Sequence, residues 1–250
     1  MLENVKKKES MMNDLKYQNY IFDLYGTLID IHTDEEDPAL WVKIAKKLLK
    51  DYGAEYTGPE LRKQYLLFCK EEEEALQARN HAEYPEIKIE KVWARLINEK
   101  TFNSSENDNL LDKYDSKTVI PEELEPFCIY FREASRDKFC KYKDTDKLLS
   151  TLKNAGKKVY LLSNAQLFFT RKELMDADIN KYFDDIFISS DLGIKKPQKE
   201  FMENLIKKHS LNKDECVMIG NEVLCDGGVA KANNVDSIII KDGDFSKILG

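Results

Sequence analysis

The stretch Tyr20-Ile-Phe-Asp-Leu-Tyr-Gly-Thr-Leu28 joins an apolar run to a carboxylate and a glycine-containing turn. Its first part, Tyr20–Leu24, contains no proline and is mostly apolar, which is typical of a strand buried on both faces of a parallel sheet. Four later runs have the same character, so five buried strands are expected in all. The other four are Lys158–Leu162, Asp185–Ile188, Cys216–Ile219 and Ser237–Ile240.

Helical patterns separate these strands in the second half of the chain. They are Thr145–Ala155, Phe168–Ala177, Gln198–His209 and Cys225–Asn233. Strands that alternate with helices form βαβ units, whose parallel sheet is covered by helices on both faces. The sequence therefore predicts an α/β protein with a Rossmann-like, parallel, five-stranded sheet.

A long insertion interrupts this alternation after the first strand. Residues 25–157 separate the first core strand from the second, and they are mostly helical in pattern. The expected helices are Pro38–Tyr52, Pro59–Arg79, Ile87–Glu99 and Pro121–Phe139, with a polar loop over Thr101–Thr118. We therefore expect an N-terminal tail at 1–17, an α/β core formed by 18–32 and 140–250, and a helical domain at 33–139.

Composition excludes several classes of protein. The 250 residues include 39 basic and 46 acidic side chains, a formal net charge of −7, which argues against nucleic-acid and anionic-membrane partners. No apolar run is long enough for a membrane span, and residues 1–20 lack the apolar core of a secretory signal. Five widely spaced cysteines fit free thiols in a reducing compartment, so a cytoplasmic location is expected. The oligomeric state stays open.

Polar residues follow four of the predicted strands. Asp23 and Thr27 follow the first strand, Ser163 and Asn164 the second, Lys196 the third, and Asn221, Glu222 and Asp226 the fourth. Ligands of open α/β sheets bind beyond the carboxyl ends of the strands, so these side chains are expected to meet at one edge. Each group taken alone is more simply a buried, capped carboxylate, a turn or a helix start, and the prediction rests on their shared position.

The same motifs resemble the haloacid dehalogenase-like (HAD) hydrolase superfamily. The resemblance covers residues 18–30 and about 140–245, and it rests on four segments in order. These are Asp23-Leu-Tyr-Gly-Thr-Leu28, Leu161-Leu-Ser-Asn164, Lys196-Pro197 and Ile219-Gly-Asn221 through Asp226. The helical insertion lies where families of this superfamily carry a cap domain.

The resemblance implies a hydrolase in which Asp23 is the nucleophile and forms an aspartyl ester. Lys196 would supply a positive charge to Asp23 and to the transferred group. Ser163 and Asn164 would donate hydrogen bonds to substrate oxygens, and Thr27 would orient the nucleophile. The substrate implied is a small anionic molecule, most simply a phosphate ester.

A magnesium ion is implied as the cofactor of the phosphatases in this superfamily. Its ligands would be Asp23, the backbone carbonyl of Tyr25 and Asn221, with Asp226 supporting them from outside. The usual aspartate is replaced by Asn221, which weakens the expected binding because an amide carries no charge. Glu222 could supply the lost carboxylate or could equally be a surface residue.

Tyr25 is the second departure from the phosphatases, which mostly have an aspartate there as general acid and base. A phenol can donate a proton but is a poor base at neutral pH. The Asp-x-Tyr-Gly-Thr form instead resembles the metal-free haloacid dehalogenases. Against these, the chain has no arginine between Asp23 and Leu61 and has Met202 where they carry a tyrosine. A phosphatase is favoured, with a dehalogenase or a catalytically weak binding protein as alternatives.

Overall fold

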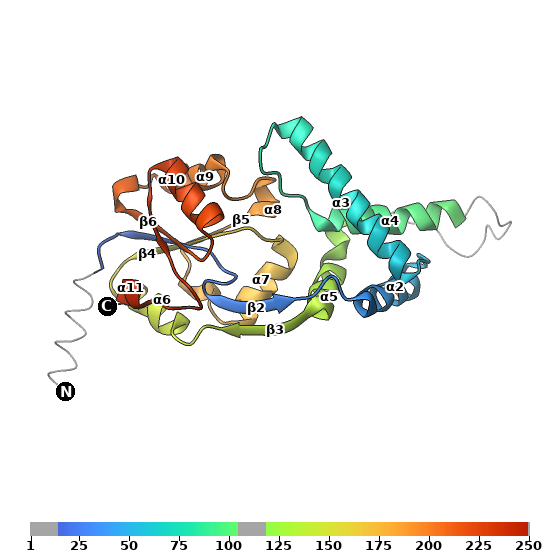
Figure 1. Cartoon of the computed structure of the whole chain (residues 1–250), viewed down its shortest axis with the longest axis horizontal. Coiled ribbons are helices and arrows are strands. Elements are labelled where there is room, and N and C mark those ends of the chain that lie inside the picture. The colour runs from blue at the N-terminus through green and yellow to red at the C-terminus, as the bar shows by residue number, and fades with distance from the viewer. Residues whose placement is uncertain (1–14, 105–118, 250) are drawn as a thin grey trace. The chain divides into compact units, whose positions relative to one another are not determined.

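The structure is a computed structural model, which describes residues 15–104 and 119–249. The N-terminal tail expected at 1–17 lies mostly outside this range. A parallel sheet of five strands forms the centre of the α/β part, in the order β5-β4-β1-β6-β7 (Figure 1). Its strands are β1 (Asn19–Phe22), β4 (Lys158–Ser163), β5 (Asp185–Ile188), β6 (Cys216–Gly220) and β7 (Asp236–Ile239). The predicted α/β class and five-stranded parallel sheet are confirmed.

The central strand β1 brings the predicted motifs together. Phe22, its last residue, is in register with Leu161 of β4 on one side and with Ile219 of β6 on the other. The residues that follow these three strands therefore leave the sheet at one edge. Asp23 therefore lies between the ends of two strands, β4, which ends at Ser163, and β6, which ends directly before Asn221.

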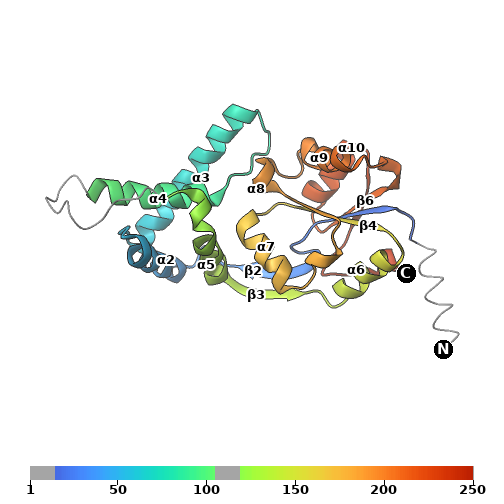
Figure 2. The ribbon, with the colours of Figure 1, turned by 180° about the vertical axis from the view of Figure 1, so that it is seen from behind.

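Helices cover both faces of the sheet because successive strand residues point to opposite sides. Tyr20 and Phe22 pack into one buried cluster with α6 (Thr145–Asn154) and α7 (Leu167–Asp176). Ile21 packs into the other with α9 (Lys199–His209) and α10 (Gly228–Asn233). Figure 2 shows the same sheet from behind. Short helices α8 (Ser189–Leu192) and α11 (Ser246–Leu249) complete this part, with 3-10 turns at Asn180–Tyr182 and Lys213–Glu215.

The chain divides into two compact units. One contains residues 1–31, 82–86 and 138–250, and the other contains 32–81 and 87–137. The second unit holds α2 (Pro38–Tyr52), α3 (Gly58–Asn80), α4 (Ile89–Ser104), a 3-10 turn (Pro121–Leu124) and α5 (Glu125–Ser135). Its core is a group of aromatic rings whose neighbouring centroids lie 4.7–6.4 Å apart: Trp41, Tyr65, Trp93, Phe127 and Phe131.

Two strands were not predicted. β2 (Ile29–Thr33) and β3 (Arg136–Lys141) pair as a separate two-stranded sheet. The helix expected to reach Phe139 instead ends at Ser135, and Arg136 already has extended backbone angles. No Gly or Pro marks this boundary in the sequence, so the pattern did not reveal it. Pairing with β2 provides hydrogen-bond partners for the backbone of β3, and the strand preference of these residues alone does not indicate this pairing.

Two other boundaries differ from the prediction. The loop expected at Thr101–Thr118 begins later, because α4 continues to Ser104; residues 105–118 lie outside the described range. The helix expected at Cys225–Asn233 is split into a π-helical turn, Val223–Gly227, followed by α10. This wider turn carries Asp226, which is buried.

Candidate active site

Asp23 is fixed directly at the end of the central strand. Its backbone N–H donates to the carbonyl of Ile219 at 2.9 Å, which continues the sheet pairing one residue beyond β1. The chain then turns sharply at Gly26, whose φ is +77°. A Cβ atom at this glycine would lie 2.4 Å from Nδ2 of Asn221, so only glycine allows this close approach. The turn thereby sets Asn221 beside the first motif.

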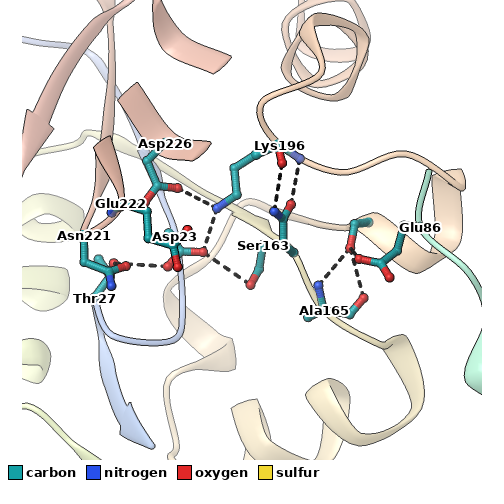
Figure 3. A network of polar contacts seen from close by, with 11 residues as sticks. Asp23, Thr27, Glu86, Ser163, Ala165, Lys196, Asn221, Glu222 and Asp226 are labelled. Carbon is teal, nitrogen blue, oxygen red and sulfur yellow. Dashed lines mark hydrogen bonds and ion pairs between the residues drawn. The ribbon is translucent and has the colours of Figure 1, made fainter. Parts of the chain in front are cut away.

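Lys196 joins two carboxylates in the interior of the site. Its Nζ lies 2.7 Å from Oδ1 of Asp23 and 2.7 Å from Oδ1 of Asp226 (Figure 3). The three residues are 7%, 3% and 1% exposed for Asp23, Lys196 and Asp226 respectively. Two carboxylates against one ammonium leave a formal negative charge uncompensated. A buried group with this charge favours a further cation, or a hydrogen-bond donor, close to it.

The surroundings act on the charge of both partners. Burial raises the pKa of the Asp23 carboxyl, and Asp226 raises it further, while the Lys196 ammonium opposes both. Burial alone would lower the pKa of Lys196, but the two carboxylates beside it outweigh that effect and raise its pKa. Lys196 therefore stays charged and is the group that favours the ionised, nucleophilic form of Asp23.

Two hydroxyl groups complete the surroundings of the Asp23 carboxylate. Thr27 Oγ1 donates to Asp23 Oδ2 at 3.2 Å and lies at the same distance from Asn221 Oδ1. Ser163 Oγ, at the end of β4, is 3.5 Å from Asp23 Oδ1. Both side chains are fully buried. The structure thus brings Thr27, Ser163 and Asn221 to Asp23, where the sequence placed them.

The side chain of Asn164 binds the backbone of the loop that carries Lys196 (residues 193–197, called the lysine loop). Its Oδ1 accepts the backbone N–H of Lys196 at 2.8 Å, and its Nδ2 donates to the carbonyl of Lys196 at 3.1 Å. The side-chain amide of Asn164 therefore holds both backbone hydrogen-bonding groups of Lys196. Asn164 was predicted to donate to substrate oxygens, and in this structure it holds Lys196 in place.

Asp226 is held by its own turn. Its Oδ2 accepts the backbone N–H of Glu222 at 2.9 Å, while its Oδ1 accepts from Lys196. A Cβ atom on Gly220 would lie 2.1 Å from Asp226 Oδ2, so a side chain there would displace the carboxylate. Glu222 contributes its backbone to this arrangement, and the residue itself is exposed.

The oxygens near Asp23 suit a hard cation. Asp23 Oδ2 and Asn221 Oδ1 both lie within 3.2 Å of the same Thr27 hydroxyl, so two oxygen donors face one small region. Mg²⁺ commonly binds one or two such protein oxygens and completes its shell with water and substrate phosphate. Within residues 15–104 and 119–249 no group of three or more His, Cys, Asp or Glu is arranged to hold a metal ion.

Tyr25 points its hydroxyl towards α7. The phenol donates to a carboxylate oxygen of Glu173 and lies 3.1 Å from Thr170 Oγ1. Glu173 is only 2% exposed. Glu173 was not predicted as a site residue, although an acidic side chain within the helical pattern Phe168–Ala177 is compatible with a buried polar contact.

A second group missed from sequence lies beside the lysine loop. Glu86, from the inserted region, accepts a hydrogen bond from Ser189 Oγ at 2.9 Å and another from Gln166 Nε2 at 3.1 Å. These residues are distant in sequence and belong to no motif that the pattern reveals. Only the folded chain brings them together, and Figure 3 shows Glu86 beside Ala165.

A comparison with protein families identifies the architecture. The model of the haloacid dehalogenase-like hydrolases matches residues 17–233, which is most of the chain. The chain belongs to this family. The resemblance seen in the sequence is thereby confirmed, and the protein is a hydrolase by family.

Curated relatives of this HAD hydrolase are phosphatases. It is 26% identical over 148 residues to a phosphoglycolate phosphatase from Colwellia psychrerythraea, covering 58% of this chain and 62% of the relative. It is 29% identical over 104 residues to a glyceraldehyde 3-phosphate phosphatase from Methanocaldococcus jannaschii, covering 42% of this chain and 46% of the relative. In both cases the match spans less than two thirds of the relative's length.

Among solved structures, a HAD phosphatase from Thermococcus onnurineus is similar with a TM-score of 0.54 and 18% identity. The match covers 93% of this chain and 91% of the other. At this identity the likeness concerns the fold. In the part of the chain that the structure describes, no helix combines the length and the apolar character needed to cross a membrane.

Proposed function

We propose that this HAD hydrolase cleaves small phosphate esters through a covalent intermediate on Asp23. The observation that supports this most directly is the buried contact of Lys196 Nζ with Asp23 Oδ1 at 2.7 Å. A carboxylate at the end of a central strand, held beside a fixed positive charge, is suited to attack an anionic centre. Without that charge, the carboxylate and the anionic substrate would repel each other.

The reaction has two steps. In the first, an Asp23 oxygen attacks phosphorus, the bond from phosphorus to the ester oxygen breaks, and the alcohol leaves after gaining a proton. In the second, water attacks the same phosphorus and returns a proton to the group that protonated the alcohol, the bond to Asp23 breaks, and inorganic phosphate leaves with the carboxylate restored. Lys196 and Ser163 lie where they can stabilise the negative charge that develops on the transferred group.

We propose that Mg²⁺ assists this reaction. Asp23, Asn221 and the backbone carbonyl of Tyr25 would hold it, and Asp226 would support the site through Lys196 and the turn at Glu222. When bound, the ion would neutralise charge on the phosphate group and help to orient it. Because Asn221 supplies an uncharged oxygen, binding is expected to be weaker than at a site with an aspartate in this position.

Tyr25 is proposed as the proton donor to the leaving alcohol. The Tyr25 hydroxyl donates a hydrogen bond to Glu173. It can therefore give a proton to the alcohol only after this hydrogen bond is replaced by one to the substrate. An aspartate at this position would need no such exchange. We therefore expect slower acid catalysis than in phosphatases that carry an aspartate two residues after the nucleophile.

The substrate class follows from the site and from the relatives. A buried lysine and hydroxyl donors suit a phosphate monoester, and phosphoglycolate and glyceraldehyde 3-phosphate are the first candidates because they are named for curated relatives.

We place the reaction in the cytoplasm, because all five cysteines are free thiols.

A panel of phosphate monoesters, assayed with Mg²⁺ and with a chelator, tests the proposal. Metal-dependent phosphate release from wild-type protein, and none from Asp23→Asn, is the expected result. Halide release from 2-chloropropionate, unaffected by the chelator, would instead indicate the dehalogenase alternative. Folded wild-type protein that releases neither phosphate nor halide would contradict a catalytic role and favour a binding protein.

A further inference from the structure

A five-residue segment of the inserted region belongs to the α/β unit. Residues 82–86, between α3 and α4, group with the sheet and not with the helices on either side. Pro85 forms an antiparallel bridge with Ile194, the Glu86 N–H donates to Gly193 at 3.1 Å, and the Lys195 N–H donates to Tyr84 at 3.0 Å. The segment therefore lies along the chain immediately before Lys196.

The carboxylate of Glu86 holds a buried serine. Ser189 Oγ accepts the backbone N–H of Ala165 at 2.8 Å and lies 2.9 Å from Glu86 Oε2. Its single hydrogen could also reach the Ala165 carbonyl at 3.1 Å, but that carbonyl already accepts the Ser190 N–H at 3.2 Å. The carboxylate is the stronger acceptor, so the serine hydrogen points to Glu86.

These contacts reach the nucleophile through a short series of bonds. Ser189 fixes the backbone at Ala165, and the residue before it, Asn164, holds both backbone groups of Lys196. Lys196 in turn holds Asp23. Gln166, which also donates to Glu86, belongs to the same loop as Asn164. Figure 3 shows the two sets of contacts, one beside Glu86 and Ala165 and the other joining Lys196 to Asp23.

We propose that Glu86 is a positioning residue for the reaction at Asp23. Through Ser189 and Gln166 it holds the loop of Asn164, while the backbone of its own segment holds the loop of Lys196. The two loops meet where Asn164 holds the backbone of Lys196, so their relative position decides how well Lys196 faces Asp23. The inference rests on the proposed function, because it assigns Glu86 a part in that same site.

Kinetics of four single variants test this assignment. Glu86→Ala removes both acceptors, Glu86→Gln keeps one acceptor oxygen, and Ser189→Ala removes the serine that links Glu86 to Ala165. Glu83→Gln, an exposed position in the same segment, is the matched control. We expect kcat to fall about 10- to 100-fold in Glu86→Ala and less in Glu86→Gln, with KM changed by less than about threefold.

The double variant separates positioning from general damage. If Glu86 acts through Ser189, the loss in Glu86→Ala/Ser189→Ala equals the larger single loss, because the second change removes a link already broken. Losses that multiply, or a Glu86→Ala kcat within twofold of the Glu83→Gln control, would overturn the proposal. If Glu86→Ala does not fold, Glu86→Gln and Ser189→Ala provide the same comparison.

Hydrogen exchange gives a readout that needs no turnover. Mass spectrometry of peptides covering 164–167 and 193–197 is expected to show about fivefold or faster exchange in Glu86→Ala, and no change in Glu83→Gln. Unchanged exchange in both peptides would overturn the proposal. If wild-type protein has no activity, the proposed function fails on its own, and exchange still decides whether Glu86 holds the two loops.

Discussion

Lys196 is 3% exposed and donates to two buried carboxylates at 2.7 Å, so its charge is balanced entirely within the protein. Replacement by methionine keeps the length of the side chain but leaves Asp23 and Asp226 buried without a cation. Breaking a buried ion pair in this way commonly costs about 3–5 kcal/mol.

We therefore expect Lys196→Met to lose turnover. We also expect its free energy of unfolding to be lower than that of the wild type by about 3–5 kcal/mol. Urea unfolding measures the second effect, and Lys195→Met, at the adjacent half-buried position, serves as the control. A Lys196→Met protein as stable as the wild type would show that the two carboxylates do not share this charge.

Tyr25 allows a second test at the same scale. Tyr25→Phe keeps the ring and removes only the hydroxyl, so a role as proton donor predicts a kcat lower by about 100-fold or more. Thr170→Ala, which removes the neighbouring hydroxyl but leaves Tyr25 intact, is the control for disturbance of α7. Full activity in Tyr25→Phe would mean that the phenol only anchors α7 through Glu173.

The end of β6 shows how a single element sets the site. Gly220 has no room for a Cβ atom, because Asp226 Oδ2 would lie 2.1 Å away. Gly220→Ala is expected to displace Asp226 and, with it, Lys196. We predict at least a tenfold loss of kcat, whereas Gly227→Ala, whose Cβ atom would meet only Ile239 at 3.8 Å, should retain activity. Equal kcat values in the two variants would contradict this close packing.

Asp184 lies just before β5 and binds the start of β4, and its contacts predict how stability depends on pH. Burial raises the pKa of Asp184, but hydrogen bonds from Lys153, the Val159 N–H and Lys158 outweigh it and leave the pKa below its usual value. A lowered pKa stabilises the fold above the unfolded-state pKa of about 4, and this contribution is lost as the pH falls through the folded-state value.

Because Asp184 is exposed to solvent, which screens these ion pairs, Asp184→Asn should lower the free energy of unfolding by only about 0.5–1 kcal/mol at pH 7, and the difference from wild type should shrink as the pH falls towards 3. Urea unfolding of both proteins at the two pH values is the measurement. A difference that is the same at both would refute the assignment to the ionised carboxylate.

Elements with a clear pattern were predicted well from sequence. Pro38–Tyr52 coincides with α2, since Asp37 caps it and Gly53 ends it, and Asp185–Ile188 coincides with β5. β2 and β3 were missed because Ile29–Thr33 and Arg136–Lys141 are partly exposed and polar. Such strands exist through their pairing with each other, and a single segment carries no sign of its partner.

At the scale of the whole molecule, chain order predicted which side chains would meet, because parallel strands end at one edge. Asp23, Thr27, Ser163, Lys196, Asn221 and Asp226 are brought together for this reason. Glu86 and Glu173 follow no strand of the sheet, so the same argument could not find them. Their contacts depend on packing between segments that are far apart in the sequence.

The most direct test of a nucleophilic Asp23 is to trap the phosphorylated protein. Wild-type protein is quenched with acid during turnover of a phosphate ester, reduced with borohydride, digested and analysed by mass spectrometry. An acyl phosphate on Asp23 predicts conversion of that residue to homoserine, only when substrate is present and not in Asp23→Asn. Homoserine at another residue, or undiminished phosphate release by Asp23→Asn, would contradict the account.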